Sequence, residues 1–264
     1  MLEGVFARAA ADRRAAFIPY LMAGDPDVET TALLLEELTR AGAGAIELGI
    51  PYGDPLADGP TVAAAGARAL ARGVRIDDVL SIVRQAVARE CSPIVLFSYF
   101  NPIYQYGIDA FARAAADAGV AGVIVPDVAL EETGALQRAL ADRGLAMPLL
   151  VAPTTPVSRA ERIVAGATGF VYVVSRLGVT GADAKQDMAP LREHVAALRK
   201  ITDMPLAVGF GISRAEQVRA VSEFADGFAV GSALIDAYAG TSGSEAAARV
   251  RIFVAQLYGR DGGS

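Results

Sequence analysis

The stretch that decides the fold is "AIELGIPYGDPLADGPTV", residues 45–62. It begins as an apolar run with strand character and continues into a loop rich in glycine and proline. Because side chains alternate along a strand, Ile46, Leu48 and Ile50 share one face and Glu47 lies on the other. A carboxylate among core residues needs an explanation, which depends on the fold that the rest of the chain predicts.

Eight apolar runs punctuated by Gly and Pro recur along the 264-residue chain, and segments of helical period lie between most of them. This alternation predicts a parallel sheet covered by helices. Eight strands predict a (β/α)8 TIM barrel, with an extra N-terminal helix and additional helices. A doubly wound open sheet is the alternative. The runs are AAFIPYLMAG, GAIELGIP, SPIVLFSYF, GVIVPD, AMPLLVAP, GFVYVVS, MPLAVGFG and DGFAVGS, and helical segments include 28–40, 108–118, 130–143 and 158–165.

Composition excludes several classes of protein. The formal net charge is -6 and basic runs are absent, which argues against binding to nucleic acid or a membrane surface. A single cysteine, Cys91, excludes an internal disulfide and favours a reducing compartment. No signal-peptide core, membrane-spanning run or Pro/Gly/Ser-rich linker is found. We therefore expect residues 1–264 to form a single barrel domain of a soluble, cytoplasmic protein.

Glu47 is the first candidate for chemistry. The aliphatic face of its strand should pack on helices, which points Glu47 into the barrel, where burial raises the pKa of a carboxyl group. Such a group gives and takes a proton near neutral pH. The alternative is a structural acid held by an arginine or by backbone amides. Asp58 follows in "PLADGP", on a loop that can fold over the barrel mouth, although Asp58 and Asp54 also fit ordinary turns.

The last two strands end in "GFGIS" and "VGSAL". Gly209, Gly211 and Gly231 allow close approach of a ligand to the backbone, and Ser213 and Ser232 fit the N-caps of the following helices. Amides at helix N-termini bind anions, and these two loops are the usual phosphate site of a barrel. The alternative is that the glycines serve tight turns only. No P-loop motif is present, which argues against a nucleotide hydrolase.

Aromatic residues on or near the carboxyl-terminal halves of the strands can wall an apolar pocket for a flat ligand, although core packing is the commoner role of each one. They are Tyr20, Phe97, Tyr99, Tyr172 and Phe210.

The scarce residue types limit the mechanism. The only histidine, His194, lies in the helical segment "PLREHVAALRK" and is predicted to be a surface residue. One histidine and one cysteine cannot form the usual zinc site, so no metal is expected. Lys185 and Lys200 are the only lysines, and neither lies in a strand, which disfavours a Schiff base. A carbon–carbon lyase on this barrel must therefore use carboxylates and a substrate that stores electrons itself.

Five motifs, "ELGIPYGDPLADGP", "GVIVPDVALEE", "SRLGVTGA", "GFGIS" and "VGSAL", strongly resemble the tryptophan synthase alpha chain family. The resemblance runs from "FIPYLMAGDP" to "VGSALID", nearly the whole chain. Two positions depart from the family pattern: Gly53 stands where serine is common, and Tyr20 stands where phenylalanine is common.

The resemblance implies cleavage of indole-3-glycerol phosphate to indole and glyceraldehyde 3-phosphate by a retro-aldol reaction. It makes Glu47 the general acid/base and Asp58 the partner of the indole N–H. It places Tyr172 beside the reacting side chain and lets Thr180 close onto Asp58. The phosphate site by resemblance comprises Gly181, Phe210, Gly211, Gly231 and Ser232.

The resemblance also implies a partner, a tryptophan synthase beta chain that carries pyridoxal phosphate and joins indole to serine in an alpha2beta2 tetramer. The chain itself then needs no cofactor. Three alternatives are a free-standing indole-releasing lyase, a catalytically dead activator of a beta chain, and a generic sugar-phosphate isomerase, which the specific loop motifs disfavour. The expected contact surface comprises Pro51, Asp54, Pro55, Asn101 and the loop at Gly178.

Overall fold

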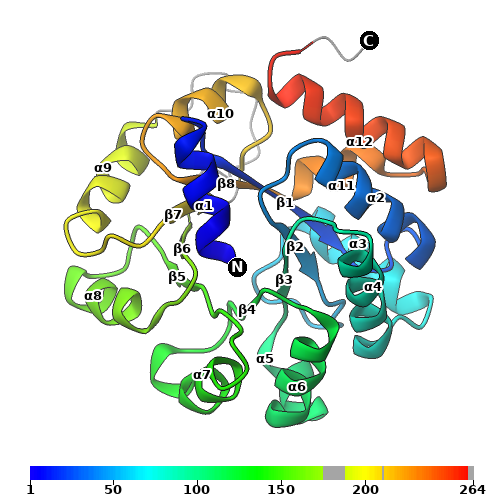
Figure 1. The fold of residues 1–264 in the computed structure, drawn as a ribbon, viewed down its shortest axis with the longest axis horizontal. Helices are drawn as coiled ribbons and strands as arrows, with labels where there is room; N and C mark the ends of the chain where they lie inside the picture. The colour runs from blue at the N-terminus through cyan, green and yellow to red at the C-terminus, as the bar shows by residue number, and fades with distance from the viewer. Residues whose placement is uncertain (175–187, 210, 261–264) are drawn as a thin grey trace.

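A computed structural model describes residues 1–174, 188–209 and 211–260 of the chain. Within them, eight parallel strands run in the order β4-β3-β2-β1-β8-β7-β6-β5, and helices surround them on the outside (Figure 1). The eight predicted strands are all present. They are β1 Ala16–Met22, β2 Ile46–Gly49, β3 Ile94–Phe97, β4 Gly122–Ile124, β5 Leu149–Val151, β6 Val171–Val174, β7 Leu206–Gly209 and β8 Gly227–Val230.

The sheet closes on itself between β4 and β5. Gly122 and Ala146 form a parallel bridge, in which the Ala146 amide donates to the Ala121 carbonyl at 3.1 Å and the Val123 amide donates to the Ala146 carbonyl at 2.8 Å. Closure removes both free edges of the sheet. The predicted (β/α)8 barrel is therefore confirmed, and the open doubly wound sheet is excluded.

The predicted helices are found with small changes in their bounds. The segments 28–40 and 108–118 are helical over their whole predicted length, whereas 130–143 divides into a 3-10 turn and a shorter helix around Thr133. The helices are α1 Leu2–Ala11, α2 Val28–Arg40, α3 Pro60–Ala71, α4 Ile76–Ala88, α5 Phe100–Tyr106, α6 Ile108–Ala118, η1 Leu130–Glu132, α7 Gly134–Ala141, α8 Val157–Gly166, α9 Ala189–Leu198, α10 Ala215–Ser222, α11 Ser232–Tyr238 and α12 Gly243–Leu257.

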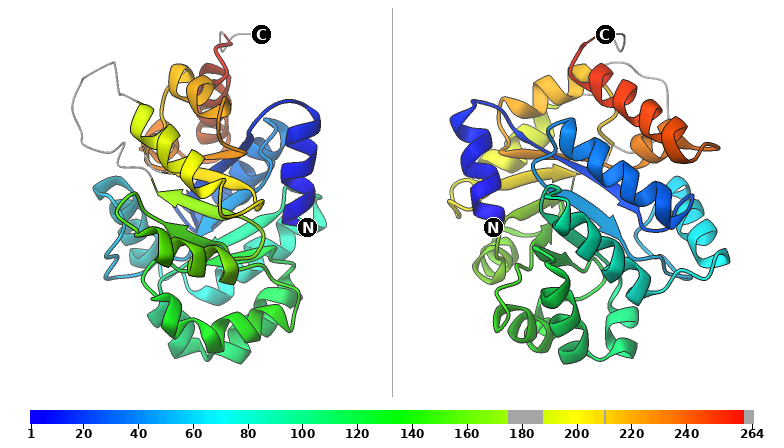
Figure 2. Two further views of the ribbon diagram at one scale, coloured as in Figure 1. Left: turned by 90° about the vertical axis from the view of Figure 1, so that its left-hand side faces the viewer. Right: turned by 45° about the vertical axis from the view of Figure 1, so that its right-hand side comes forward.

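Helix α1 lies across the end of the barrel where the strands begin (Figure 2). Its Val5 and Phe6 are buried and pack where two glycines leave room for them. A Cβ atom on Gly44 would lie 2.7 Å from Val5 Cγ1, and one on Gly227 would lie 3.0 Å from the Phe6 ring. The amino-terminal end of the barrel is therefore closed by α1, which leaves the carboxyl-terminal end for a site.

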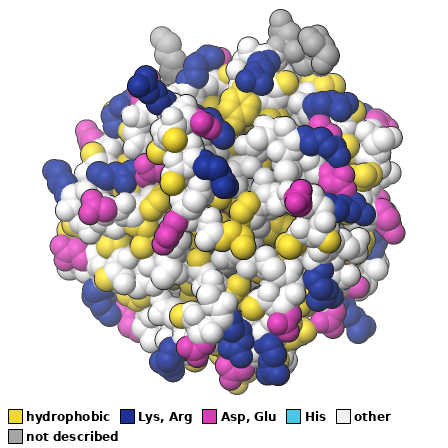
Figure 3. Space-filling view, viewed as in Figure 1, with side chains coloured by type: hydrophobic (Ala, Val, Ile, Leu, Met, Phe, Trp, Pro, Cys, Tyr) yellow, Lys and Arg dark blue, Asp and Glu magenta, His cyan; other side chains and the backbone are white. Residues whose placement is uncertain are grey.

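The surface and core follow the composition. On the face seen in Figure 3, basic and acidic side chains are interspersed, and neither sign forms a block. All seven residues of β1 are buried, and each aliphatic or aromatic side chain removed from water contributes about 1.5–3 kcal/mol. Among the described residues, no helix has the length and apolar character that a bilayer crossing requires.

The prediction that His194 is a surface residue is wrong. His194 lies on α9 next to the buried Val195 and is itself half-buried, because it shares a face of the helix with Leu191 and Leu198. Its Nε2 atom is buried and has no hydrogen-bond partner in the described part of the chain. Burial lowers the pKa of the imidazole, which keeps it neutral at pH 7.

Candidate active site

Glu47 lies inside the barrel on β2, opposite Tyr20 of β1 on one side and Val95 of β3 on the other. Its exposed fraction is 1%. Its Oε1 atom has no hydrogen-bond partner among the described residues, and burial raises the pKa of the carboxyl group to about 8. No described arginine or lysine forms an ion pair with it. Glu47 is therefore a protonated acid at neutral pH rather than an ion-paired structural residue.

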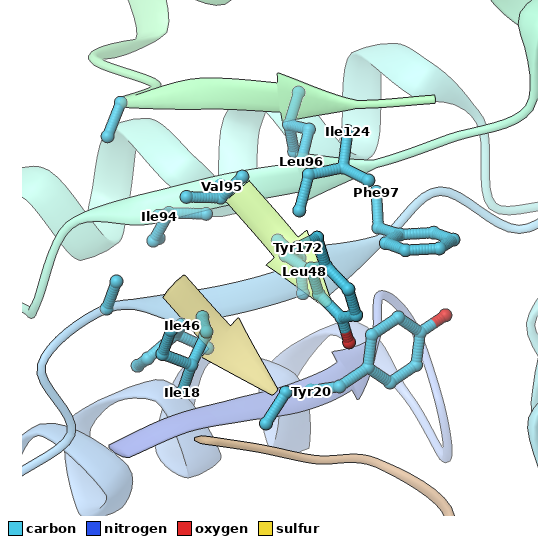
Figure 4. Close-up of a cluster of buried hydrophobic side chains, with 14 of the residues drawn as sticks. Ile18, Tyr20, Ile46, Leu48, Ile94, Val95, Leu96, Phe97, Ile124 and Tyr172 are labelled. Carbon is cyan, nitrogen blue, oxygen red and sulfur yellow. The ribbon is translucent and has the colours of Figure 1, made fainter. Parts of the chain in front are cut away.

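Three of the predicted aromatic residues, on β1, β3 and β6, lie close together next to the strand of Glu47 (Figure 4). Tyr20 and Phe97 meet edge to face, with ring centroids 5.8 Å apart, and Tyr172 of β6 points its hydroxyl towards Tyr20 (Figure 4). Burial, followed by the charge of Glu47, raises the pKa of the Tyr172 phenol. Burial, followed by the charges of Asp58 and Glu47, does the same for Tyr20. Both phenols stay neutral, and the charges of both candidate catalytic acids act on the Tyr20 phenol.

Two glycines make room for these rings. A Cβ atom on Gly49 would lie 2.1 Å from the Tyr20 hydroxyl, and one on Gly209 would lie 2.2 Å from the Tyr172 hydroxyl. Any side chain at either position would displace the ring. The sequence interpretation assigned Gly209 to approach of a ligand, whereas its contact in the structure is with Tyr172.

Asp58 reaches the site from the loop that precedes α3. The Tyr99 hydroxyl donates a hydrogen bond to Asp58 Oδ1 at 2.8 Å and accepts one from the Ala57 amide at 2.9 Å. Tyr99 lies just beyond the carboxyl end of β3, so this pair of bonds fixes the loop over the barrel mouth. Burial raises the pKa of Asp58, and the hydrogen bond from Tyr99 opposes that effect. Asp58 is only half-buried, so water reaches it and it is the more readily ionised of the two acids.

The predicted phosphate residues are described in part. Gly211 has φ of +85°, a conformation that suits glycine. Gly231 is the N-cap of α11, and its Cβ position lies 3.6 Å from Tyr20 Cβ, which sets this loop against the aromatic wall. The predicted N-caps are wrong by one residue: Ser232 is the first residue of α11, and Ser213 precedes Arg214, the N-cap of α10. Gly178, Thr180, Gly181 and Phe210 lie outside the described residues.

The predicted partner surface is mostly on the outside of the molecule. Asp54 and Asn101 are exposed, Pro55 is half-buried and Pro51 is buried. Sequence reasoning missed two large apolar side chains in the same loop and helix, Leu56 and Tyr104, which are 78% and 61% exposed. Exposed apolar side chains of this size mark binding surfaces when they cluster. The sequence contained a signal for both, since Leu56 interrupts a polar loop and Tyr104 follows Asn101 by one helical turn.

A chain of contacts connects this surface to Asp58. Asn101 Nδ2 donates to the Tyr52 hydroxyl at 3.3 Å. The Tyr52 ring packs on Tyr99 with centroids 5.4 Å apart, and Tyr99 in turn holds Asp58. A partner that moves Asn101 or Tyr52 can therefore change the position of the loop that carries Asp58.

A cavity of about 330 Å³ lies at the opposite end of the barrel, lined by Arg8, Ala16, Gly44 and Pro93 among others. These residues precede or begin β1, β2 and β3. Glu47, the second residue of β2, is not among the residues that line this cavity. Within the described ranges, no group of His, Cys, Asp and Glu side chains is arranged to hold a metal ion.

Comparison with known proteins gives a consistent result. A sequence model of the tryptophan synthase alpha chain family matches residues 6–258. The chain is 47% identical over 243 residues to a tryptophan synthase alpha chain of Picosynechococcus sp., covering 92% of each chain. It is 48% identical over 254 residues to that of Gloeobacter violaceus, covering 96% of this chain and 92% of the relative.

Solved structures agree with the sequence comparison. A chain of Mycobacterium tuberculosis tryptophan synthase superimposes with a TM-score of 0.89 at 37% identity, covering 98% of this chain and 96% of that one. A tryptophan synthase alpha chain of Legionella pneumophila superimposes with a TM-score of 0.85 at 35% identity, covering 97% and 94%.

Proposed function

The chain belongs to the tryptophan synthase alpha chain family, and from that membership we propose how its residues divide the family's reaction between them. The reaction is the lyase step that cleaves indole-3-glycerol phosphate to indole and glyceraldehyde 3-phosphate in tryptophan biosynthesis. The observation that carries the assignment of roles is Glu47, a buried acid with an unpartnered oxygen and a pKa of about 8. Such a group holds a proton at neutral pH and can deliver it inside a dry barrel.

We propose that Glu47 moves both protons of the reaction. It donates its proton to C3 of the indole ring, which leaves a positive charge on the ring and a carboxylate on Glu47. The carboxylate then takes the proton of the hydroxyl on the carbon attached to C3. The bond between these two carbons breaks, its electrons restore the indole, and the carbon becomes the aldehyde of glyceraldehyde 3-phosphate. Glu47 ends protonated, as it began, so no external proton is consumed.

Asp58 has the complementary role in this proposal. Its half-buried carboxylate faces the ring from the loop side and accepts a hydrogen bond from the indole N–H. The carboxylate then stabilises the positive charge that forms on the ring. Electrostatic stabilisation of this kind is usually the largest single contribution to lowering the activation barrier. Tyr99 holds Asp58 in place at 2.8 Å. Tyr20, Phe97 and Tyr172 supply the apolar walls for the flat ring.

We also propose the residues that bind the substrate phosphate and the partner chain. The phosphate is bound by Gly211, Gly231 and Ser232, together with Gly181 and Phe210 outside the described residues, and Thr180 closes onto Asp58. The partner is a tryptophan synthase beta chain, which carries the pyridoxal phosphate that the alpha chain does not need. The beta chain contacts Pro51, Asp54, Pro55, Asn101 and the loop at Gly178, and the exposed Leu56 and Tyr104 extend this surface.

We also place the enzyme in the cytoplasm, as one barrel domain over residues 1–264.

The experiment that tests the function is an assay of indole release from indole-3-glycerol phosphate, with the purified chain alone and with a beta chain. General acid–base catalysis is worth about two to four orders of magnitude, so Glu47→Gln should lose at least a hundredfold. The control Glu193→Gln changes an exposed glutamate of α9 and should keep wild-type activity. Indole release within tenfold of wild type by Glu47→Gln would remove Glu47 from the reaction.

A further inference from the structure

An ionic cluster around a buried carboxylate lies at the point where the end of β1 meets α3 and α11. Asp25 follows β1 and is 1% exposed. Arg68 of α3 donates two hydrogen bonds to it, from Nε to Oδ1 at 2.7 Å and from Nη2 to Oδ2 at 2.9 Å. The Tyr238 hydroxyl, at the last residue of α11, donates to Oδ2 at 3.3 Å. One carboxylate therefore connects two helices to the end of one strand.

The strand end that carries Asp25 is itself held in place. The Gly24 amide donates to Thr31 Oγ1 at 3.0 Å, and the Thr31 hydroxyl donates to the Asp27 carbonyl at 2.9 Å. Gly24 has φ of +79°, and a Cβ atom there would lie 2.5 Å from a Val74 methyl. The backbone around Asp25 is thus held firmly in place. Asp25 can therefore position the two helices, α3 and α11, whose side chains bind it.

The two helices lead to the residues of the site. Helix α3 begins at Pro60, two residues after Asp58, and its N-cap Gly59 has no side chain with which to hold the turn. Arg68 is the strongest polar anchor of α3, because a bidentate arginine–carboxylate pair fixes orientation as well as distance. Helix α11 begins at Ser232. The contacts of Asp25 therefore set the position of Asp58 relative to the loop assigned to phosphate.

We propose that Asp25 is a positioning residue of the lyase reaction, which acts by holding α3, and with it Asp58, against the barrel mouth through Arg68. This inference rests on the role proposed for Asp58. Tyr99 fixes Asp58 from the side of β3, and Asp25 fixes it from the side of β1. Removing the second anchor leaves Asp58 attached at one side only. A displacement of about 1 Å at a reacting group can lower a rate about a hundredfold.

The test compares two variants with a matched control. Asp25→Asn removes the charge while keeping the shape, and Arg68, whose side chain is 48% exposed, is then hydrated. Arg68→Lys keeps the charge and loses the paired hydrogen bonds. The control is Arg159→Lys, which changes a bidentate pair between α8 and Glu131, with both hydrogen bonds at 3.1 Å. That pair lies beside β5, away from Asp58.

The measurement is kcat for indole release at saturating indole-3-glycerol phosphate with a beta chain present, in the wild-type and the Asp58→Asn backgrounds. We expect Asp25→Asn and Arg68→Lys to lower kcat at least tenfold in folded protein, with Arg159→Lys within twofold of wild type. In the Asp58→Asn background, the residual slow cleavage should fall less than twofold further, because the group being positioned is already absent. Inhibition by inorganic phosphate should persist in both single variants.

Two results would overturn the inference. The first is a kcat within threefold of wild type in both Asp25→Asn and Arg68→Lys, whatever their melting temperatures. The second is a loss of the same size with and without Asp58, which would show a general loss of structure. If Asp25→Asn fails to fold, Arg68→Lys decides by the same comparison. Wild-type activity of Asp58→Asn itself would instead refute the proposed function, and the positioning role with it.

Discussion

Glu47→Gln should make the protein more stable as well as inactive, and the gain should grow with pH. A glutamine has nearly the shape of glutamate but no proton to lose. Glu47 is fully buried with a pKa of about 8 against an ordinary value of 4.5. A group whose charged form is disfavoured in the folded state lowers the stability of that state whenever the unfolded chain ionises it.

The magnitude follows from the two pKa values. Below about pH 4.5, Glu47 is protonated in both states and costs nothing. Between pH 4.5 and 8 the unfolded chain loses the proton while the folded chain keeps it, so stability falls by about 1.4 kcal/mol for each pH unit. Above pH 8 both states are ionised, and the cost levels off near 5 kcal/mol in total. From pH 5.5 to pH 8 the wild type should lose about 3 kcal/mol relative to Glu47→Gln.

The assay is thermal or urea unfolding of wild type, Glu47→Gln and the exposed-site control Glu193→Gln at pH 5.5 and 8. A difference of about 3 kcal/mol corresponds to about 6 °C or more in melting temperature for a chain of this length. The unpartnered amide of the glutamine costs about 1–3 kcal/mol, but this cost is the same at both pH values. Parallel curves for wild type and Glu47→Gln would refute the conclusion that Glu47 is held protonated.

Three further predictions follow from the contacts of the site. Asp58→Asn should lower indole release at least a hundredfold, because an amide cannot offset a positive ring, while calorimetry still detects binding of inorganic phosphate; loss of that binding would place Asp58 elsewhere. Gly49→Ala should destabilise the protein by about 1–3 kcal/mol and reduce turnover, because its Cβ would lie 2.1 Å from the Tyr20 hydroxyl; an unchanged melting temperature would contradict this. Pro55→Ala should weaken the stimulation of cleavage by a beta chain, and full stimulation in a titration with that chain would exclude Pro55 from the interface.

The elements of this barrel could be predicted from sequence because each has a local signal. The apolar runs between glycines and prolines gave all eight strands, and alternation along β2 placed Glu47 inside. The burial of His194 was missed, although Leu191, three residues before it, and Leu198, four residues after it, mark the buried face of the helix. The N-caps were misplaced by one residue, because Gly231 and Arg214 take positions that serine usually occupies.

Contacts between distant segments were out of reach of the sequence for a different reason. Tyr99 and Asp58 are 41 residues apart, and Arg68 and Asp25 are 43 residues apart. Neither pair lies on a shared helix or strand that would fix its spacing. The parallel pairing of β2 with β1 and with β3 brings the loop after β2 against the ends of those two strands. The role of Gly209 also depends on a distant residue. In the sequence it suggests a backbone that a ligand can approach, whereas in the structure it leaves room for the ring of Tyr172.

The most direct test of the account is the pH dependence of kcat/KM for cleavage of indole-3-glycerol phosphate in the presence of a beta chain. This quantity reports the essential groups of the free enzyme. Glu47 must begin the reaction protonated, so kcat/KM should be high near pH 7 and fall tenfold per pH unit above an apparent pKa of about 8. A kcat/KM that stays constant from pH 7 to about pH 9.5 in the folded complex would contradict Glu47 as the acid that protonates the indole ring.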